Sequence, residues 1–401
     1  MKICLERERK ETNMSLKPKQ SFIPFLNEHT IIIDPGKRNV KVFDVKDGNI
    51  RYAFNFPSIT HLVPNFNGYE SASEKQFRFE HSGERYLVGE VVNGDHSYET
   101  TKVNRHHQVC VYTAIARLVE DGEIVNLVVG FPSSDFKNEE TFKQYTDMLR
   151  GTEGEEIEVI LNNDRKSFTI RDFAVYPEGM ALYTRQTSSQ KSKTSEAYHV
   201  IDVGGQNVNY RLYDRNGNSS SAYSLDSAGM NYLQKELRKA LRDVINGDLI
   251  DLRAIDFEEV VETGEIPNVE QINGFDSPKD FVNYHVKQFI INNIEKELAD
   301  DVNLKQKGYK IIFTGGGSLR LQPYLESLYE VNKDNLIFST HPIYDNCASY
   351  LISYLLEQVH SEKMPYEAGE RAYMDFISQL QSPHFEERRQ LGKVRTSFSM
   401  K

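Results

Sequence analysis

Two stretches of the chain place an aspartate at the end of an apolar run, directly before a glycine turn. The first is "IIIDPGKRNVKVFDVKDGN", from residue 31, and the second is "VIDVGGQNVNYRLYDRNGN", from residue 200. Asp34 in the first stretch corresponds to Asp202 in the second, and a glycine follows each aspartate two residues later. A strand that turns back at a glycine can point several backbone N–H groups into one concavity, which binds anions. The two stretches therefore predict a pair of phosphate-binding turns.

The carboxylates of these turns cannot contact phosphate directly, because like charges repel. They imply a divalent cation between carboxylate and phosphate, and Mg²⁺ held through water molecules is the usual one. Lys41, on the strand that returns from the first turn, would direct a positive charge at the phosphates. Each turn taken alone is also compatible with an ordinary hairpin, whereas the matched pair favours phosphate binding.

The repeat extends beyond the aspartates. Both copies run through a second strand into a hairpin turn, Asp47-Gly48 in one and Asn216-Gly217 in the other. Their separation far exceeds the roughly 20 to 50 residues of a solenoid repeat. The pattern therefore predicts a duplicated domain, with two turns that hold one polyphosphate from both sides.

A third stretch, "YKIIFTGGGSLRLQPYLESLY" at 309–329, reads as a buried strand, three glycines and an amphipathic helix. We expect the helix start to be marked by Ser318 and Pro323. Consecutive glycines allow the backbone to approach a flat or charged ligand closely. The stretch is not a Walker A motif, because no Gly-Lys-Ser/Thr follows, and it is not GxGxxG.

The elements that would position these motifs can be placed coarsely. The apolar run 124–132 predicts a buried parallel strand, and hence a mixed sheet with helices on both faces. Segments 231–245 and 280–298 carry apolar residues at helical spacing and are expected to be core helices. The acidic segment 255–276 between them is interpreted as a small exposed insertion. The adjacent pair His106-His107 is expected in a strand, with side chains on opposite faces, which argues against a metal site.

Length and composition limit the function classes. A chain of 401 residues is too long for one core, so two or more lobes are expected. A net charge of -11 argues against direct coating of nucleic acid by the core. The 3 cysteines lack CxxC spacing, which suits a reducing cytoplasm and offers no metal framework. No apolar run reaches the roughly 20 residues of a membrane span, and the charged start lacks the features of a secretory signal.

The C-terminal end has its own charge pattern. From Arg388 onward it carries five cations and no acid. Such a segment would contact DNA or an acidic partner, or it would be a solvated end. Both interpretations stay open at this point.

In order and spacing, the three stretches resemble the phosphate 1, phosphate 2 and adenosine motifs of the actin, heat-shock-70 and sugar-kinase superfamily. Within it the chain resembles the ParM-type bacterial plasmid-segregation actins, on the strength of its short length and three further segments. The resemblance implies an α/β, actin-like fold with two duplicated RNase H-like lobes and a nucleotide cleft between them. The three segments are "GERYLVGE" at 83–90, "LVVGFPSSDF" at 127–136 and "AVYPEGMAL" at 174–182.

The resemblance also implies a domain plan, which runs from an N-terminal extension to a basic tail. The expected parts are the extension (1–28), domain I (30–195, with 51–105 as a variable subdomain), domain II (198–350, with about 232–300 as its subdomain), a C-terminal helical segment that returns to domain I (348–375) and the basic tail (380–401).

Roles for individual residues follow from the same resemblance. Asp34 and Asp202 would hold the water shell of Mg²⁺, and Glu178, after Pro177, would orient the attacking water or accept its proton. Pro35 and the Lys37-Arg38 pair depart from the usual first loop. The nucleotide-binding residues implied are Gly36, Lys37, Arg38, Asn39 and Lys41 in the first motif, Gly204, Gly205, Gln206 and Asn207 in the second, and Gly315, Gly316, Gly317 and Ser318 in the third.

The function implied is a Mg²⁺-dependent ATPase whose nucleotide closes the lobes and drives polymerisation, while hydrolysis destabilises the filament. GTP is an alternative to ATP. Such filaments would move plasmid or phage DNA, with a ParR-type DNA-binding adaptor on a centromere-like DNA site as partner, and with no membrane involved. A small-molecule kinase on the same fold is the alternative function. A heat-shock-70-like ATPase is a third, although no C-terminal peptide-binding domain follows.

Overall fold

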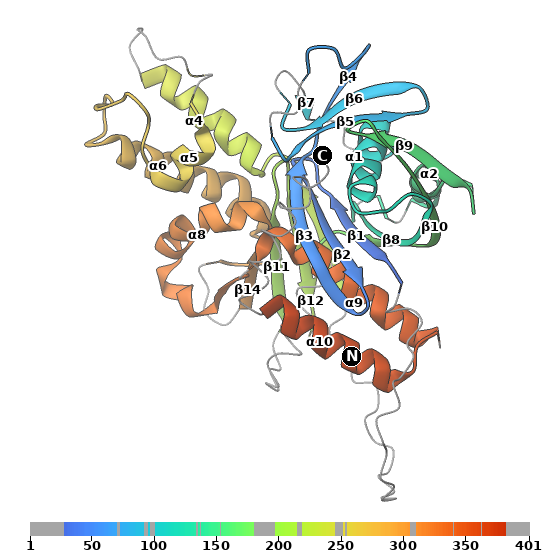
Figure 1. Ribbon diagram of the computed structural model, residues 1–401. Coiled ribbons are helices and arrows are strands. Elements are labelled where there is room, and N and C mark those ends of the chain that lie inside the picture. The colour runs from blue at the N-terminus through green and yellow to red at the C-terminus, as the bar shows by residue number, and fades with distance from the viewer. Residues whose placement is uncertain are drawn as a thin grey trace, which may run out of the picture. The chain divides into compact units, whose positions relative to one another are not determined.

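The computed structural model divides the chain into two units, each with its own sheet and buried core (Figure 1). Unit 1 comprises residues 1–185 and 346–401, and unit 2 comprises residues 186–345. The extension up to residue 27, the tail from Arg388 and the Asn216-Gly217 turn lie outside the described residues. The structure describes residues 28–69, 73–91, 95–96, 101–133, 135–136, 138–152, 154–179, 197–214, 219–244, 252, 255–304, 310–339, 341–361 and 363–381.

Unit 1 contains a ten-stranded mixed sheet in the order β3-β2-β1-β8-β10-β9-β5-β6-β4-β7. Its centre is parallel, because β8 pairs in parallel with both β1 and β10. The apolar run at 124–132 therefore forms the buried parallel strand that the sequence predicts. The strands are β1 (Thr30–Pro35), β2 (Asn39–Lys46), β3 (Asn49–Pro57), β4 (Ile59–Val63), β5 (Gln76–His81), β6 (Glu84–Gly89), β7 (Asp95–His96), β8 (Glu123–Phe131), β9 (Glu156–Leu161) and β10 (Asp164–Pro177).

Helices pack on this sheet. They are α1 (Arg105–Ala116), α2 (Glu139–Arg150), α9 (Asp345–His360) and α10 (Tyr366–Gln381). Ile31 and Ile33 share a core with α1, and alternation along the strand places buried Ile32 on the opposite face. On the strand β8, Gly130 faces α9, because a Cβ there would lie 2.3 Å from the hydroxyl of Tyr350. The histidine pair expected in a strand lies instead in α1, where the Asn104 side chain caps the helix.

The duplicated stretches form matching hairpins. In unit 1, β1 and β2 are antiparallel, with Asp34 opposite Lys41. In unit 2, β11 (Tyr198–Val203) and β12 (Val208–Tyr213) pair in the same way, with Asp202 opposite Asn209. The turn after β2 has positive φ at Asp47 (53°) and Gly48 (71°), as a tight two-residue hairpin requires.

Unit 2 has a five-stranded sheet in the order β13-β12-β11-β14-β15, in which β11 and β14 are parallel. Helices α4 and α6 with the segment that follows confirm the two core helices predicted at 231–245 and 280–298. The remaining elements are β13 (Ser219–Leu225), α4 (Met230–Val244), α5 (Phe257–Thr263), α6 (Pro278–Ile290), a π-helical turn (Ile291–Glu295), α7 (Lys296–Leu298), β14 (Lys310–Thr314), α8 (Gly316–Leu328), 3-10 turns (Glu330–Asn335 and Pro342–Tyr344) and β15 (Leu336–Phe338).

The interpretation of 255–276 as an exposed insertion is wrong. The segment forms α5, and Phe257, Val260 and Val261 on this helix are fully buried in the unit 2 core. The acids that dominate its composition lie on the other face, where Glu258 pairs with Arg320 of α8 at 3.0 Å. A short helix with one apolar face contributes to the core despite its many charged residues.

The predicted start of the helix after the three glycines is also wrong. Helix α8 begins at Gly316, so two of the glycines lie in its first turn and Pro323 lies inside it. Gly315 precedes the helix with a φ of 79°. Ser318 lies in the first turn, and its hydroxyl donates to the carbonyl of Gly315 at 2.8 Å.

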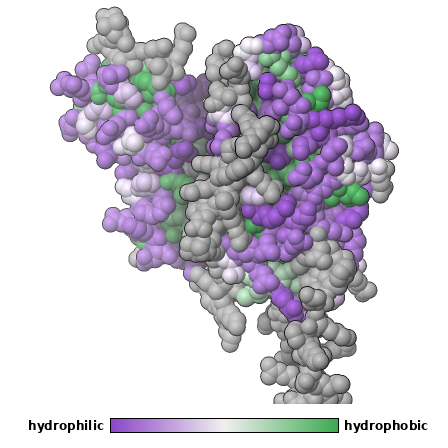
Figure 2. Space-filling view, in the orientation of Figure 1, coloured by the Kyte–Doolittle hydropathy of each residue, from purple (hydrophilic) through white to green (hydrophobic). Residues whose placement is uncertain are grey.

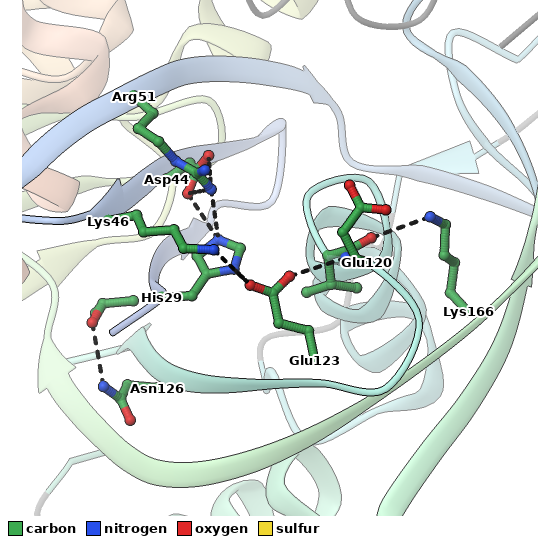
Figure 3. A network of polar contacts seen from close by, with 10 residues as sticks. His29, Asp44, Lys46, Arg51, Glu120, Glu123, Asn126 and Lys166 are labelled. Carbon is green, nitrogen blue, oxygen red and sulfur yellow. Dashed lines mark hydrogen bonds and ion pairs between the residues drawn. The ribbon is translucent and has the colours of Figure 1, made fainter. Parts of the chain in front are cut away.

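Around His29, at the residue before β1, a polar network ties several strands of unit 1 together (Figure 3). The two ring nitrogens of His29 lie 2.8 Å from Asp44 and 2.9 Å from Glu123. Arg51 contacts Asp44 and Lys46 contacts Glu123, so β1, β2, β3 and β8 share one cluster of charges. Such a network stabilises the folded state only when each of its buried charges is paired with an opposite charge.

The face seen in Figure 2 is mainly hydrophilic, and hydrophobic residues form small separate patches on it. Large exposed apolar residues belong to different elements, among them Leu62 of β4, Tyr284 of α6 and Met374 of α10. Among the described helices, none combines the length and the hydropathy that crossing a membrane requires.

Candidate functional site

In unit 1 the predicted site residues lie at the carboxyl ends of neighbouring parallel strands. Asp34 lies near the end of β1, and Glu178 directly follows β10, with β8 between these two strands. The backbone N–H of Glu178 donates to Phe131 at the end of β8 at 2.9 Å. The hydroxyl of Ser133 donates to the Glu178 carbonyl at 2.6 Å. Ligands of α/β sheets bind at this edge, so the topology brings together two acids that are far apart in sequence.

The carboxylate of Asp34 is buried and surrounded by donors. Its Oδ2 accepts from the Lys41 ammonium at 3.0 Å and from the Asn346 amide at 3.4 Å. Burial alone would raise the pKa of Asp34, but the charges of Lys41 and Lys102 and these hydrogen bonds hold it below its ordinary value. The carboxyl is therefore ionised at neutral pH. Its other oxygen, Oδ1, is buried with no hydrogen-bond partner among the described residues.

The loop between β1 and β2, which the sequence predicts to bind phosphate and which is called the first phosphate loop below, is tightly closed around Gly36. A Cβ at Gly36 would lie 2.5 Å from the Nζ of Lys41 and 2.9 Å from the carbonyl of Asn39. Glycine is required here for close approach and not for a positive φ. The Gly36 N–H donates to the Asp34 carbonyl at 2.9 Å, so this N–H serves the turn itself. The carbonyl of Arg38 accepts from Ser58, which ties the loop to the segment after β3.

Two residues that the sequence interpretation did not single out complete the unit 1 site. The ammonium of Lys102, which is only 1% exposed, contacts the carboxylate of Glu178. The Asn346 side chain, in the first turn of α9, bridges Asp34 and the next loop, because its Oδ1 accepts from the Gly179 N–H at 3.2 Å. No local pattern marks either residue, since both act on groups far away in the chain.

His107 supports the same loop from α1. It is fully buried, and its Nδ1 lies 3.1 Å from the capping oxygen of Asn104. Burial lowers the pKa of His107 well below its ordinary value, and the nearby charges of Lys102, His106 and Lys37 add to the effect. Its imidazole is therefore neutral, and its proximity to Lys37 places this end of α1 beside the first phosphate loop.

In unit 2 the second and third motifs lie in direct contact. Asp202, which is buried, lies near the end of β11 and pairs with Thr314 at the end of the parallel strand β14. Gly315 follows with a φ of 79°, and a Cβ there would lie 2.2 Å from the Oδ1 of Asp202. Both its positive φ and this close approach require glycine. The structure thus places Asp202 against the first glycine of the third motif.

The loop between β11 and β12, which the sequence predicts to bind phosphate and which is called the second phosphate loop below, packs on the start of α4. Its carbonyls at Gly204 and Gly205 accept from the N–H groups of Met230 and Asn231 at 3.0 and 2.8 Å. A Cβ at Gly229 would lie 2.3 Å from the carbonyl carbon of Gln206, so this glycine, which the sequence interpretation missed, permits the contact.

Other side chains of unit 2 hold the loops in place. The Asn207 amide donates to Asn209 and Ser224, at 3.2 and 2.7 Å, and therefore points along the sheet. Gly317 contacts Val203 and Met230 closely, whereas a Cβ at Gly316 would make only an ordinary 3.8 Å contact with Ile343. The three glycines are therefore not equivalent.

The side chains available as ligands determine how the predicted metal ion could be held. Within the described residues no group of three or more His, Cys, Asp or Glu side chains could hold a metal ion directly. The ionised Asp34 nevertheless offers its orphaned Oδ1, which a water molecule of a hydrated cation would satisfy. These residues fit Mg²⁺ held through water rather than through a cage of protein ligands.

Known proteins resemble this chain in part of its sequence and in its fold. Residues 33–180 match the family model described as actin like proteins N terminal domain. No curated protein sequence matches the chain. Among solved structures, a filament of Alp12 is 23% identical and covers 82% of this chain and 99% of its own, with a TM-score of 0.56.

Two further solved structures show the same fold. A 15-stranded ParM filament from Clostridium botulinum is 18% identical, covers 81% of this chain and 98% of its own, and has a TM-score of 0.59. The archaeal actin homolog Ta0583 in complex with ADP is 16% identical, covers 85% of this chain and 99% of its own, and has a TM-score of 0.58.

The fold is therefore the actin-like one, and here each of the two α/β units carries a strand-turn-strand hairpin with a buried aspartate near the end of its first strand. Residues 33–180 are similar to the actin-like N-terminal domain, and the chain as a whole has the actin-like fold.

Proposed function

We propose that this actin-like protein is a nucleoside triphosphatase that assembles into filaments when its nucleotide is bound. The observation that carries the proposal is the matched pair of hairpins, which presents one buried aspartate, Asp34 or Asp202, at a strand end in each unit. In this proposal the first and second phosphate loops would bind the same triphosphate. The ADP bound to the archaeal homolog supports adenine nucleotides as the first ligands to test.

The residues of unit 1 would do the chemistry of hydrolysis. Phosphoryl transfer needs an aligned water molecule and neutralisation of charge, and little covalent help from the protein. Glu178 would orient the water, and Lys41 would offset charge on the phosphates. Asp34, together with Asp202 of unit 2, would hold Mg²⁺ through water, and the ion, when bound, supplies further neutralisation of phosphate charge.

The residues of unit 2 would hold the rest of the nucleotide. Gly315 and Gly317 leave room where side chains would collide, so backbone can line a flat ligand there. Because Gly204 uses its N–H within the turn, at 2.9 Å from the Asn207 carbonyl, Gly205 and Gln206 are the proposed phosphate donors of the second loop. Ser318 would act indirectly, by fixing the Gly315 carbonyl.

Filament formation is supported by the two filament structures that share the fold. Heterologous contacts that do not close into a ring propagate as a polymer, and a nucleotide that favours the assembling conformation stabilises it. Within this proposal the filament moves plasmid or phage DNA and is captured by a DNA-binding adaptor. The net charge of -11 suits indirect contact with DNA.

The test is assembly with a matched variant. Light scattering of the full chain should rise after addition of ATP and Mg²⁺, and negative-stain images should show filaments. Asp202→Ala should abolish both signals, because one of the two aspartates is lost. The same assay with GTP in place of ATP shows which nucleotide base the protein accepts. Discrete oligomers in place of filaments, together with phosphoryl transfer to a second substrate, would instead indicate a small-molecule kinase. No assembly by the unmodified chain would contradict the proposal.

A further inference from the structure

The unit 1 site contains a lysine whose burial needs an explanation. Lys102 is 1% exposed and is among the largest fully buried side chains of the protein. A lysine is almost never fully buried unless its charge is paired, because removing an ammonium from water costs several kcal/mol. The partner of Lys102 is Glu178, the residue that would orient the attacking water.

The backbone around Lys102 is fixed by a capping arrangement. The Asn104 side chain caps α1 by accepting from the His107 N–H at 2.9 Å, and its amide donates to the Thr101 carbonyl at 3.0 Å. The Thr101 hydroxyl accepts from the Val103 N–H at 3.1 Å. Lys102 lies inside this short segment, so the helix start determines where its ammonium can reach.

Lys102 acts on both acids of the unit 1 site. It contacts the carboxylate of Glu178 directly, and its charge contributes to the lowered pKa of Asp34. The backbone after Glu178 is held separately, by the bond from the Gly179 N–H to Asn346. Glu178 is therefore held at its carboxylate by Lys102 and at its loop by Asn346.

We propose that Lys102 is a positioning residue for hydrolysis, which holds the carboxylate of Glu178 in the orientation that aligns the attacking water. This inference rests on the proposed nucleoside triphosphatase function and assigns to Lys102 a role in the rate of hydrolysis, not in nucleotide affinity. A purely structural ion pair would predict the opposite, a loss of stability without a specific loss of turnover.

The test compares Lys102→Met, which keeps the length and removes the charge, with Glu178→Gln and the double variant. We expect K102M to lower kcat by about 10- to 100-fold, within the range that general acid–base groups contribute. Affinity for a fluorescent ATP analogue should change less than about threefold. The double variant should be no slower than E178Q alone, because residues that act as a unit give non-additive losses.

Two further variants separate the role from a folding effect. Lys102→Arg keeps a cation and should restore more than about a tenth of the wild-type kcat. Lys46→Met removes another paired lysine of unit 1, 3.1 Å from Glu123, and should leave kcat unchanged. If K102M is too unstable to purify, K102R and E178Q carry the test, and equal kcat values for these two would overturn the inference.

The outcomes are distinguishable from failure of the proposed function. Hydrolysis by the wild-type chain together with an unchanged kcat in K102M would overturn this inference alone. Losses that multiply in the double variant would overturn it as well, since Lys102 would then act independently of Glu178. No hydrolysis by the wild-type chain with any nucleoside triphosphate would overturn the proposed function and this inference with it.

Discussion

At the scale of single residues, the glycines of the three motifs differ in what they permit. Gly36 makes room for the Lys41 ammonium, Gly229 for the second phosphate loop and Gly315 for the Asp202 carboxylate. Only the last of these three has a positive φ. A glycine-rich motif therefore combines separate steric requirements, and the contact partner of each glycine determines how much a methyl group would cost.

This difference gives a prediction for Gly315→Ala against Gly316→Ala. At Gly315 an added Cβ would lie 2.2 Å from Asp202 and 2.5 Å from the Val203 carbonyl. We expect G315A to cost about 1–3 kcal/mol of unfolding free energy, through strain and overpacking. It should also weaken nucleotide binding by at least about tenfold, because Asp202 is displaced. Urea unfolding and titration with a fluorescent ATP analogue measure both effects.

Gly316→Ala is the matched control for that variant. Its Cβ would meet Ile343 at an ordinary 3.8 Å, and alanine favours the helix that begins there. Stability should stay at the wild-type level, and nucleotide affinity should fall much less than in Gly315→Ala, because Asp202 is not displaced. Equal losses in the two variants would show that the contact with Asp202 is not what makes Gly315 necessary.

At the scale of elements, charged groups at strand ends hold the unit 1 sheet together. His29 precedes β1, Asp44 lies on β2 and Glu123 opens β8 (Figure 3). Partial burial alone would raise the pKa of Glu123. The Glu120 N–H, the charge of His29 and the Lys46 ammonium together lower it below its ordinary value of 4.5.

The direction of this shift predicts a pH dependence. The folded-state pKa of Glu123 is lowered, so the ionised carboxylate stabilises the folded state. This contribution to stability is fully present when the pH is above the ordinary pKa near 4.5, and it is lost as the pH falls through the folded-state pKa. Glu123→Gln should therefore destabilise unit 1 at pH 7, by less than about 1 kcal/mol after allowance for solvent screening. The difference from wild type should shrink at pH 3 to 4.

Urea unfolding at the two pH values checks this prediction. The exposed Glu156→Gln at the start of β9 serves as a control, with little effect expected at either pH. A Glu123→Gln penalty that grew on acidification would contradict the assigned direction.

At the scale of the whole molecule, each of the two units has a buried core of its own among the described residues. One core surrounds Leu233 on α4, and the other surrounds Ile115 on α1. Each of these residues is fully buried. Domains with separate cores often fail to unfold in a single two-state step, so calorimetry can follow the two units individually.

This organisation predicts which transition each core variant affects. Leu233→Ala should destabilise unit 2 and Ile115→Ala unit 1, each by about 2–5 kcal/mol. If one nucleotide is bound by both units, a non-hydrolysable ATP analogue with Mg²⁺ should raise both transitions by mass action. A rise in only one transition would contradict shared binding.

Much of the fold and part of the candidate site could be predicted from the sequence, because their signals are local. The β-branched runs, the Asp-x-Gly turns and the Asp47-Gly48 pair specify hairpins through residues adjacent in the chain. The repetition of that pattern indicated two related units, and it located Asp34 and Asp202 at strand ends. The buried parallel strand was visible as an uninterrupted apolar run.

Only the tertiary structure revealed which groups act on these acids. No local pattern marks Lys102, Asn346 or Gly229. Their contacts are with Glu178, Gly179 and Gln206, which lie in other segments of the chain. The acidic composition of 255–276 concealed the buried face of α5, because composition does not record which side of a helix meets the core. Residue types and turn chemistry are local properties, whereas the partner of a buried charge depends on how strands and helices are arranged in space.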